Sequence, residues 1–135
     1  MTESTFALAV DLGGTKVESA LVDASGTLLE ASRFRAPTGR TATAELLAAS
    51  VVSVVRQSLA ARPPGSDLLG VGIGSAGPIT VAQGLVSPLN LPAWRDYPLR
   101  DLVAAEAPDQ PVLLRMDGEC ITLAEHWRGA AQGES

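Results

Sequence analysis

The sequence has little of what several classes of protein require. Its 135 residues include one cysteine, one histidine and one lysine, and only 4% of them are aromatic. A single cysteine cannot form an internal disulfide, and one cysteine with one histidine cannot make a zinc site. No run approaches the roughly 20 apolar residues that span a bilayer, and no basic segment precedes an apolar stretch as in a secretory signal. We therefore expect a cytoplasmic protein without membrane association.

The charge balance is acidic. Fifteen Asp and Glu outnumber ten Lys and Arg, for a formal net charge of −5, and no basic run appears. This argues against a nucleic-acid partner. With 46% hydrophobic residues the chain is too apolar for a disordered segment, and its length is that of one ordinary domain.

Hydrophobic periodicity predicts strands that alternate with helices. The expected order is β-β-β-α-β-(hairpin)-α-β-α, which indicates a mixed five-stranded sheet covered by helices, class α/β. The first three strands form an antiparallel meander, and a short helix opens at Pro98 and ends before Pro108. The predicted strands are 6–10, 17–22, 27–35, 68–73 and 111–116, the longer helices are 44–61 and 117–131, and the hairpin lies within 78–91.

The turn Asp11-Leu-Gly-Gly-Thr-Lys16 follows the first buried strand. A carboxylate at a strand end can hold Mg²⁺, glycines let backbone N–H groups approach a phosphate, and Thr15 adds a hydroxyl. The alternative is a tight hairpin with an aspartate at its corner, which is common. It is not a Walker A loop, because no helix follows it.

A glycine-rich turn, Gly72-Ile-Gly-Ser-Ala-Gly-Pro78, follows the fourth predicted strand. It matches a dinucleotide-binding fingerprint, but that fingerprint needs a helix directly afterwards, and residues 78–81 read as extended. Ser75 could be a nucleophile with Asp117 and His126, but Ile73 replaces the first glycine of G-x-S-x-G and no helix follows the serine.

Three further features leave alternatives open. Asp117 follows an apolar strand, so it is either a helix N-cap or a general base aimed into a cleft. His126 is interpreted as a surface residue of the last helix, not as a ligand. Trp94 and Tyr97 are either a sugar-stacking platform or core packing, and packing is the more common use of such aromatic residues.

Four ordered segments together resemble the N-terminal lobe of the ROK family (repressors, open reading frames and sugar kinases), within the actin/hexokinase/Hsp70-like superfamily. The resemblance covers nearly the whole chain. Its segments are Asp11-Leu-Gly-Gly-Thr15, Gly70-Val-Gly-Ile-Gly-Ser-Ala-Gly-Pro78, Ser87-Pro-Leu-Asn-Leu-Pro-Ala-Trp94, and Met116-Asp117 followed by Leu123-Ala-Glu-His-Trp-Arg-Gly129.

The resemblance implies a ribonuclease-H-like, actin-like ATPase lobe that serves an ATP-dependent kinase of a hexose or N-acetylhexosamine. The alternative is the non-catalytic sugar-sensing lobe of a ROK-type transcriptional regulator. ATP and Mg²⁺ are the implied cofactors, and a small-molecule sugar is the implied partner. By position, the resemblance makes Asp117 the catalytic base, Asn90 a ligand of sugar hydroxyls, Gly77 part of the turn lining the sugar pocket, and Asp11, Gly13, Gly14 and Thr15 the Mg²⁺–phosphate turn, with Asp11 as the metal residue.

Two departures from the family pattern matter. Met116 and Glu119 stand where the family has asparagines. The first of these asparagines contributes sugar hydrogen bonds in typical kinases, and a methionine makes no useful hydrogen bond to a sugar. We therefore expect either the choice of sugar or the kinase activity itself to differ from the family pattern. The second lobe, with its adenosine pocket and zinc motif, is absent. We therefore expect residues 1–135 to be an N-terminal lobe that is inactive alone, with apolar residues exposed in 99–107, and the full-length protein to be a homo-oligomer.

Overall fold

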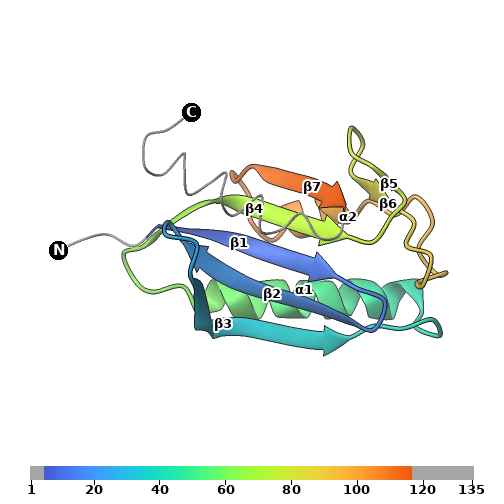
Figure 1. Cartoon of the computed structure of the whole chain (residues 1–135), viewed down its shortest axis with the longest axis horizontal. Coiled ribbons are helices and arrows are strands. Elements are labelled where there is room, and N and C mark those ends of the chain that lie inside the picture. The colour runs from blue at the N-terminus through green and yellow to red at the C-terminus, as the bar shows by residue number, and fades with distance from the viewer. Residues whose placement is uncertain (1–4, 117–135) are drawn as a thin grey trace.

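The computed structural model describes residues 5–116 of the chain. Three strands begin it, β1 (Thr5–Leu12), β2 (Lys16–Asp23) and β3 (Leu28–Pro37), followed by the helix α1 (Ala44–Ala60) (Figure 1). After α1 come β4 (Asp67–Ser75), the short strands β5 (Ile79–Thr80) and β6 (Leu85–Val86), the helix α2 (Leu99–Ala104) and β7 (Val112–Met116). The predicted element order is confirmed as far as β7, and the predicted helix 117–131 lies outside the described residues.

Five strands form one mixed sheet in the order β3-β2-β1-β4-β7. The pairs β1–β2 and β2–β3 are antiparallel, as a meander requires, whereas β1–β4 and β4–β7 are parallel. The strands β5 and β6 pair separately as the expected small hairpin. The parallel pairs decide where a ligand can bind, because they bring the carboxyl ends of β1, β4 and β7 to one edge of the sheet.

Both helices cover one face of the sheet, drawn behind it in Figure 1. Alternate residues of the central strands point to this face and are fully buried, as the period-two pattern requires. The helix α1 contributes a stripe at helical spacing, and the Thr43 hydroxyl caps it by accepting the N–H of Leu46 at 3.1 Å. The core includes Leu8, Val10, Leu12, Val17, Leu21, Leu47, Val51, Val54, Val55, Val71, Ile73 and Leu114.

The segment around α2 differs from the expectation that its apolar residues are exposed. Leu99 and Val103 are fully buried, and Ala107 is nearly so. The helix α2 packs against α1 and β7, so the fold itself covers this segment. Within residues 5–116, no helix is long and apolar enough to cross a membrane.

Candidate functional site

The carboxyl ends of β1, β4 and β7 form one edge of the sheet, called here the rim. Leu12 pairs in register with Ser75, and Ser75 pairs with Met116. The three arrowheads accordingly point the same way in Figure 1. The turns after β1 and β4 therefore leave the sheet side by side, and the chain that follows Met116 starts from the same edge. The sequence identified each of these segments by the buried strand that precedes it, and the parallel pairing of β1, β4 and β7 brings the three strand ends to one edge.

The turn between β1 and β2 is held by the segment that follows β3. The N–H of Gly13 donates to the carbonyl of Lys16 at 2.9 Å. The backbone N–H of Thr38 donates to the carbonyl of Thr15 at 2.9 Å, and its hydroxyl donates to the carbonyl of Gly13 at 3.0 Å. Two hydrogen bonds from one residue thus fix the turn on both sides of Gly14. Nothing in the local sequence signalled Thr38, because its partners are more than 20 residues away.

Asn90 lies against this turn. A β-carbon built on Gly14 would stand 3.0 Å from Cβ and 3.1 Å from Nδ2 of Asn90, so a larger residue at position 14 would push the asparagine away. The loop that carries Asn90 is anchored by Leu91, which is fully buried, while Asn90 itself is exposed. The structure therefore brings the predicted sugar residue and the predicted phosphate turn into contact.

Trp94 anchors the same loop from within the core. It is fully buried, stacks on Tyr97 with ring centroids 3.9 Å apart, and donates its indole N–H to the carbonyl of Ala44 at 3.3 Å. A buried indole with its N–H satisfied is a packing residue. The sugar-stacking interpretation of Trp94 is therefore wrong, and the packing alternative holds.

The turn after β4 runs directly into the hairpin and not into a helix, since β5 begins at Ile79. A dinucleotide would need a helix N-terminus at this point, so the structure agrees with the sequence argument against such a site. Ser75 is fully buried and its hydroxyl donates to the carbonyl of Ala76 at 3.0 Å. It is not presented to solvent as a nucleophile would be.

Gly77 lies under the end of the Met116 side chain. A β-carbon built at Gly77 would stand 2.7 Å from Cε and 2.9 Å from Sδ of Met116. Met116 is the last described residue and its side chain is 46% exposed. Asp117, the predicted base, lies outside the described residues together with Glu119 and His126.

Asp11 is exposed near the end of β1, opposite Glu18 of β2 in the sheet register. Glu18 is paired with three cations, Lys16 at 4.0 Å, Arg35 at 3.5 Å and Arg33. The hydrogen bond from Arg33 is the main reason that the pKa of Glu18 is lowered, and the charges of all three cations add to it. Glu18 is thus committed to these partners.

The donor set around Asp11 fits a magnesium ion that arrives with a nucleotide. Residues 5–116 contain no group of three or more histidine, cysteine, aspartate or glutamate side chains able to hold a metal. Mg²⁺ commonly keeps several waters and is held by one or two carboxylates plus substrate phosphates. Asp11, next to the turn that carries Thr15, can supply such a carboxylate.

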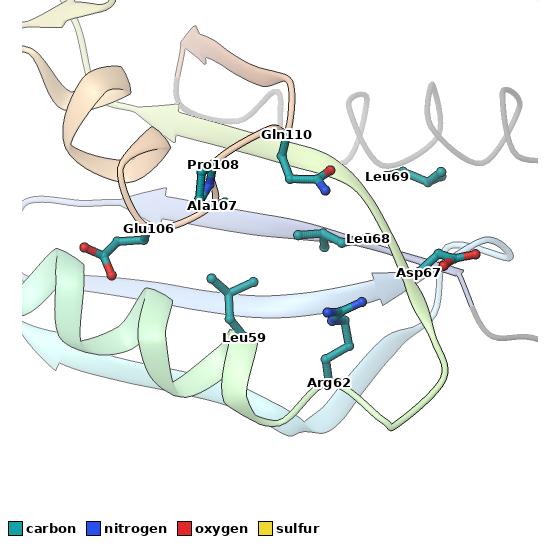
Figure 2. Close-up of a pocket in the computed structure, with 9 residues that line it drawn as sticks. All are labelled: Leu59, Arg62, Asp67, Leu68, Leu69, Glu106, Ala107, Pro108 and Gln110. Atoms are coloured by element: carbon teal, nitrogen blue, oxygen red, sulfur yellow. The ribbon is translucent and has the colours of Figure 1, made fainter.

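A cavity of about 640 Å³ lies at the opposite edge of the sheet (Figure 2). The end of α1, the start of β4 and the segment after α2 line it. Two of its three charged residues already have partners, since Arg62 donates to the carbonyl of Ser66 at 2.6 Å and Glu106 pairs with Arg56 at 2.6 Å. None of the predicted site residues lines this cavity.

Comparison with known proteins identifies the family of the chain. The model of the ROK family matches residues 7–135. The chain is 29% identical to a glucokinase of Halalkalibacterium halodurans over 92% of its own length and 37% of that enzyme. It is 30% identical to an N-acetylmannosamine kinase of Yersinia pseudotuberculosis over 88% of its length and 38% of that enzyme. It thus spans less than half the length of these relatives.

The fold is likewise shared with a solved ROK structure. A ROK family glucokinase from Streptomyces griseus, solved in complex with glucose and AMPPNP, superposes with a TM-score of 0.70 at 32% identity. The match covers 95% of this chain and 38% of that one. The predicted actin-like ATPase fold is confirmed by this likeness. The chain belongs to the ROK family.

Proposed function

We propose that residues 1–135 form the N-terminal lobe of an ATP-dependent sugar kinase, which transfers the γ-phosphate of ATP to a hydroxyl of a hexose or N-acetylhexosamine. One observation carries this proposal. The Gly13–Thr15 turn and the Asn90 loop pack closely at the rim, so that a β-carbon built on Gly14 would stand 3.0 Å from Cβ of Asn90. A turn suited to bind phosphate and a polar side chain suited to bind a sugar thus lie next to each other at the rim.

The chemistry of phosphoryl transfer asks mainly for positioning and charge neutralisation. In this proposal the glycine turn presents backbone N–H groups and the Thr15 hydroxyl to phosphate oxygens, and Asp11 holds Mg²⁺ that enters with ATP. The bound nucleotide supplies the phosphoryl group. Asn90 hydrogen-bonds sugar hydroxyls and Asp117 accepts the proton of the attacking hydroxyl.

The proposal includes a second lobe. The chain spans 37% of the Halalkalibacterium halodurans glucokinase and 38% of the Yersinia pseudotuberculosis N-acetylmannosamine kinase. In this proposal the rim forms one side of the active-site cleft. We infer that another lobe closes the cleft, carries the zinc motif of the family and excludes water, so that residues 1–135 alone do not turn over ATP. Because the substrate is ATP, we place the enzyme in the cytoplasm, where the nucleotide is made.

The test is a protein in which residues 1–135 are joined to the C-terminal lobe of the Streptomyces griseus glucokinase, with the chain alone as the control. ADP release measured with a panel of hexoses and N-acetylhexosamines should depend on sugar. Asp117→Asn should lower kcat by at least about 100-fold, the smaller end of what a general base contributes, with an unchanged thermal melt.

Three outcomes contradict the proposal. ADP release that continues without sugar shows that a sugar hydroxyl is not the phosphoryl acceptor. ADP release that survives Asp117→Asn undiminished removes Asp117 from the reaction. Thermal stabilisation by sugar with no turnover in the folded two-lobe protein identifies the alternative, the sugar-sensing lobe of a ROK-type regulator.

A further inference from the structure

Met116 gives the rim an apolar patch. Four large apolar side chains are exposed among residues 5–116. One of them, Met116, lies at the rim, and another, Leu89, precedes Asn90 in the loop that lies against the Gly14 turn. Met116 ends β7 in register with Ser75, one residue before the proposed base. A half-exposed methionine at this place is a surface that a ligand of the rim would meet.

The fold holds the thioether in a defined position. The side chain lies over Gly77, whose lack of a β-carbon leaves room for Sδ and Cε. Ser75, the register partner of Met116, is buried with its hydroxyl donated to the carbonyl of Ala76. Among the described residues, Met116 therefore contributes carbon and sulfur to the surface at this end of the rim, whereas the exposed Asn90 contributes an amide beside Gly14.

The chemistry of a thioether selects what can lie against it. Sulfur is a weak acceptor and not a donor, so a sugar hydroxyl placed on Met116 would lose its bonds to water without replacement. A methyl group placed there would gain by leaving water. We propose that Met116 is a specificity residue that favours an N-acetylhexosamine, with the acetamido methyl packed on the thioether. This inference rests on the proposed function, because it assumes that the rim binds sugar.

The chain has two methionines, Met1 and Met116, which makes a direct test feasible on residues 1–135 as they are. Labelling the methionine methyls with carbon-13 yields two signals, and Met116→Leu assigns them. Titration with N-acetylmannosamine or N-acetylglucosamine should shift the Met116 methyl, with a nuclear Overhauser effect to the acetamido methyl. The signal of Met1 serves as the internal reference.

The expected preference is about tenfold in Kd for the N-acetylated sugar over the parent hexose, the low end for one apolar group in a pocket because Met116 is half exposed. Met116→Gln, which keeps the side-chain length and adds an amide, should reduce the preference to within about twofold. Leu46→Gln, which removes an exposed leucine of α1 far from the rim in sequence, should leave it unchanged. Met116→Leu, which keeps an apolar side chain, should keep most of the preference for the N-acetylated sugar.

A second variant moves the thioether without removing it. Gly77→Ala places a β-carbon where Cε and Sδ now lie, and the flexible end of the methionine must shift. The preference for the N-acetylated sugar should fall in Gly77→Ala, and the same substitution added to Met116→Gln should have no further effect on it.

The outcomes separate this inference from the proposed function. If hexoses and N-acetylhexosamines bind equally well and both shift the NMR signal of the Asn90 side-chain amide, the rim binds sugar as proposed and the role of Met116 is refuted. If N-acetylated sugars bind without shifting the Met116 methyl, the role of Met116 is also refuted. If no sugar shifts the signals of Asn90 or Met116 in residues 1–135 at any concentration, the role of Met116 is refuted. If the two-lobe protein also shows no sugar-dependent ADP release, the proposed function fails with it.

Discussion

Replacing Ser58 by alanine should destabilise the fold several times more than replacing Ser19, although the two buried hydroxyls touch. Ser19 and Ser58 join β2 to α1, with their oxygens 2.6 Å apart. Ser19 is also 2.8 Å from the carbonyl of Val54, and Ser58 is 2.7 Å from the carbonyl of Ser32. Each hydroxyl has one proton, so two protons serve three contacts.

The surrounding structure decides which contacts are made. The carbonyl of Val54 lies four residues before Ser58 in α1 and accepts its N–H in the helical pattern. Ser32 lies in the irregular stretch of β3 between Leu29 and Phe34, where the register with β2 has no paired residue. Its carbonyl therefore depends on Ser58. We assign the proton of Ser58 to Ser32 and the proton of Ser19 to Ser58.

The magnitudes follow from this assignment. Ser58→Ala leaves a buried carbonyl without a donor, which costs about 2 kcal/mol, offset by about 0.5 kcal/mol of helix propensity, for a net loss of about 1.5 kcal/mol. Ser19→Ala leaves no buried group without a hydrogen-bond partner. It should lower the free energy of unfolding by about 0.5 kcal/mol, the lower end for one hydrogen bond. At about 4 °C per kcal/mol for a chain of this size, these are Tm shifts of about 6 °C and 2 °C.

Thermal and urea unfolding followed by circular dichroism measure both variants. Ser53→Ala, on the exposed side of the same helix, is the matched control. It should raise the stability by up to about 0.5 kcal/mol through helix propensity, because the hydroxyl it removes makes only a long, exposed hydrogen bond of 3.4 Å to Gln57. Equal losses for the Ser58 and Ser19 variants, or a larger loss for Ser19→Ala, would refute the assignment of protons.

The remaining predictions concern the turn, the charged face and the base. Thr38→Val removes the hydroxyl bond to Gly13 but keeps the backbone bond to Thr15. In the two-lobe protein it should raise the KM for ATP about fivefold, equivalent to about 1 kcal/mol, with the KM for sugar unchanged. Thr38→Ser should restore the value, and no rescue by serine would argue against this positioning role. The lowered pKa of Glu18 contributes stability that is complete above its ordinary value of 4.5 and lost as the pH falls through the lower folded-state pKa. The free energy of unfolding should therefore fall less between neutral and acid pH in Glu18→Gln than in the unmodified chain. The same fall in both proteins would contradict the ion pairs with Glu18. Asp117→Asn should lower kcat for sugar-dependent ADP release by at least about 100-fold without changing the Tm of the two-lobe protein.

Local patterns were sufficient to predict the elements of this fold. The continuous apolar run Phe6–Val10 predicts a strand buried on both faces, and the apolar residues at helical spacing in α1 indicate which side of that helix is buried. Turn residues such as those at Ser25-Gly26 and Arg62-Pro63 separate the elements. Such information lies within one element or one turn. The same patterns located the segments of the rim, since each follows a buried strand.

The contacts that build the site were decided by the tertiary structure. The order β3-β2-β1-β4-β7 places the ends of β1, β4 and β7 in one row. Asn90 then meets Gly14 and Met116 covers Gly77. Trp94 is drawn into the core instead of lining a sugar pocket. These pairs join residues 39 to 76 positions apart in the sequence. Periodicity specifies which face of an element is buried but not which distant segment covers it, because that depends on how the packed layers fill space together.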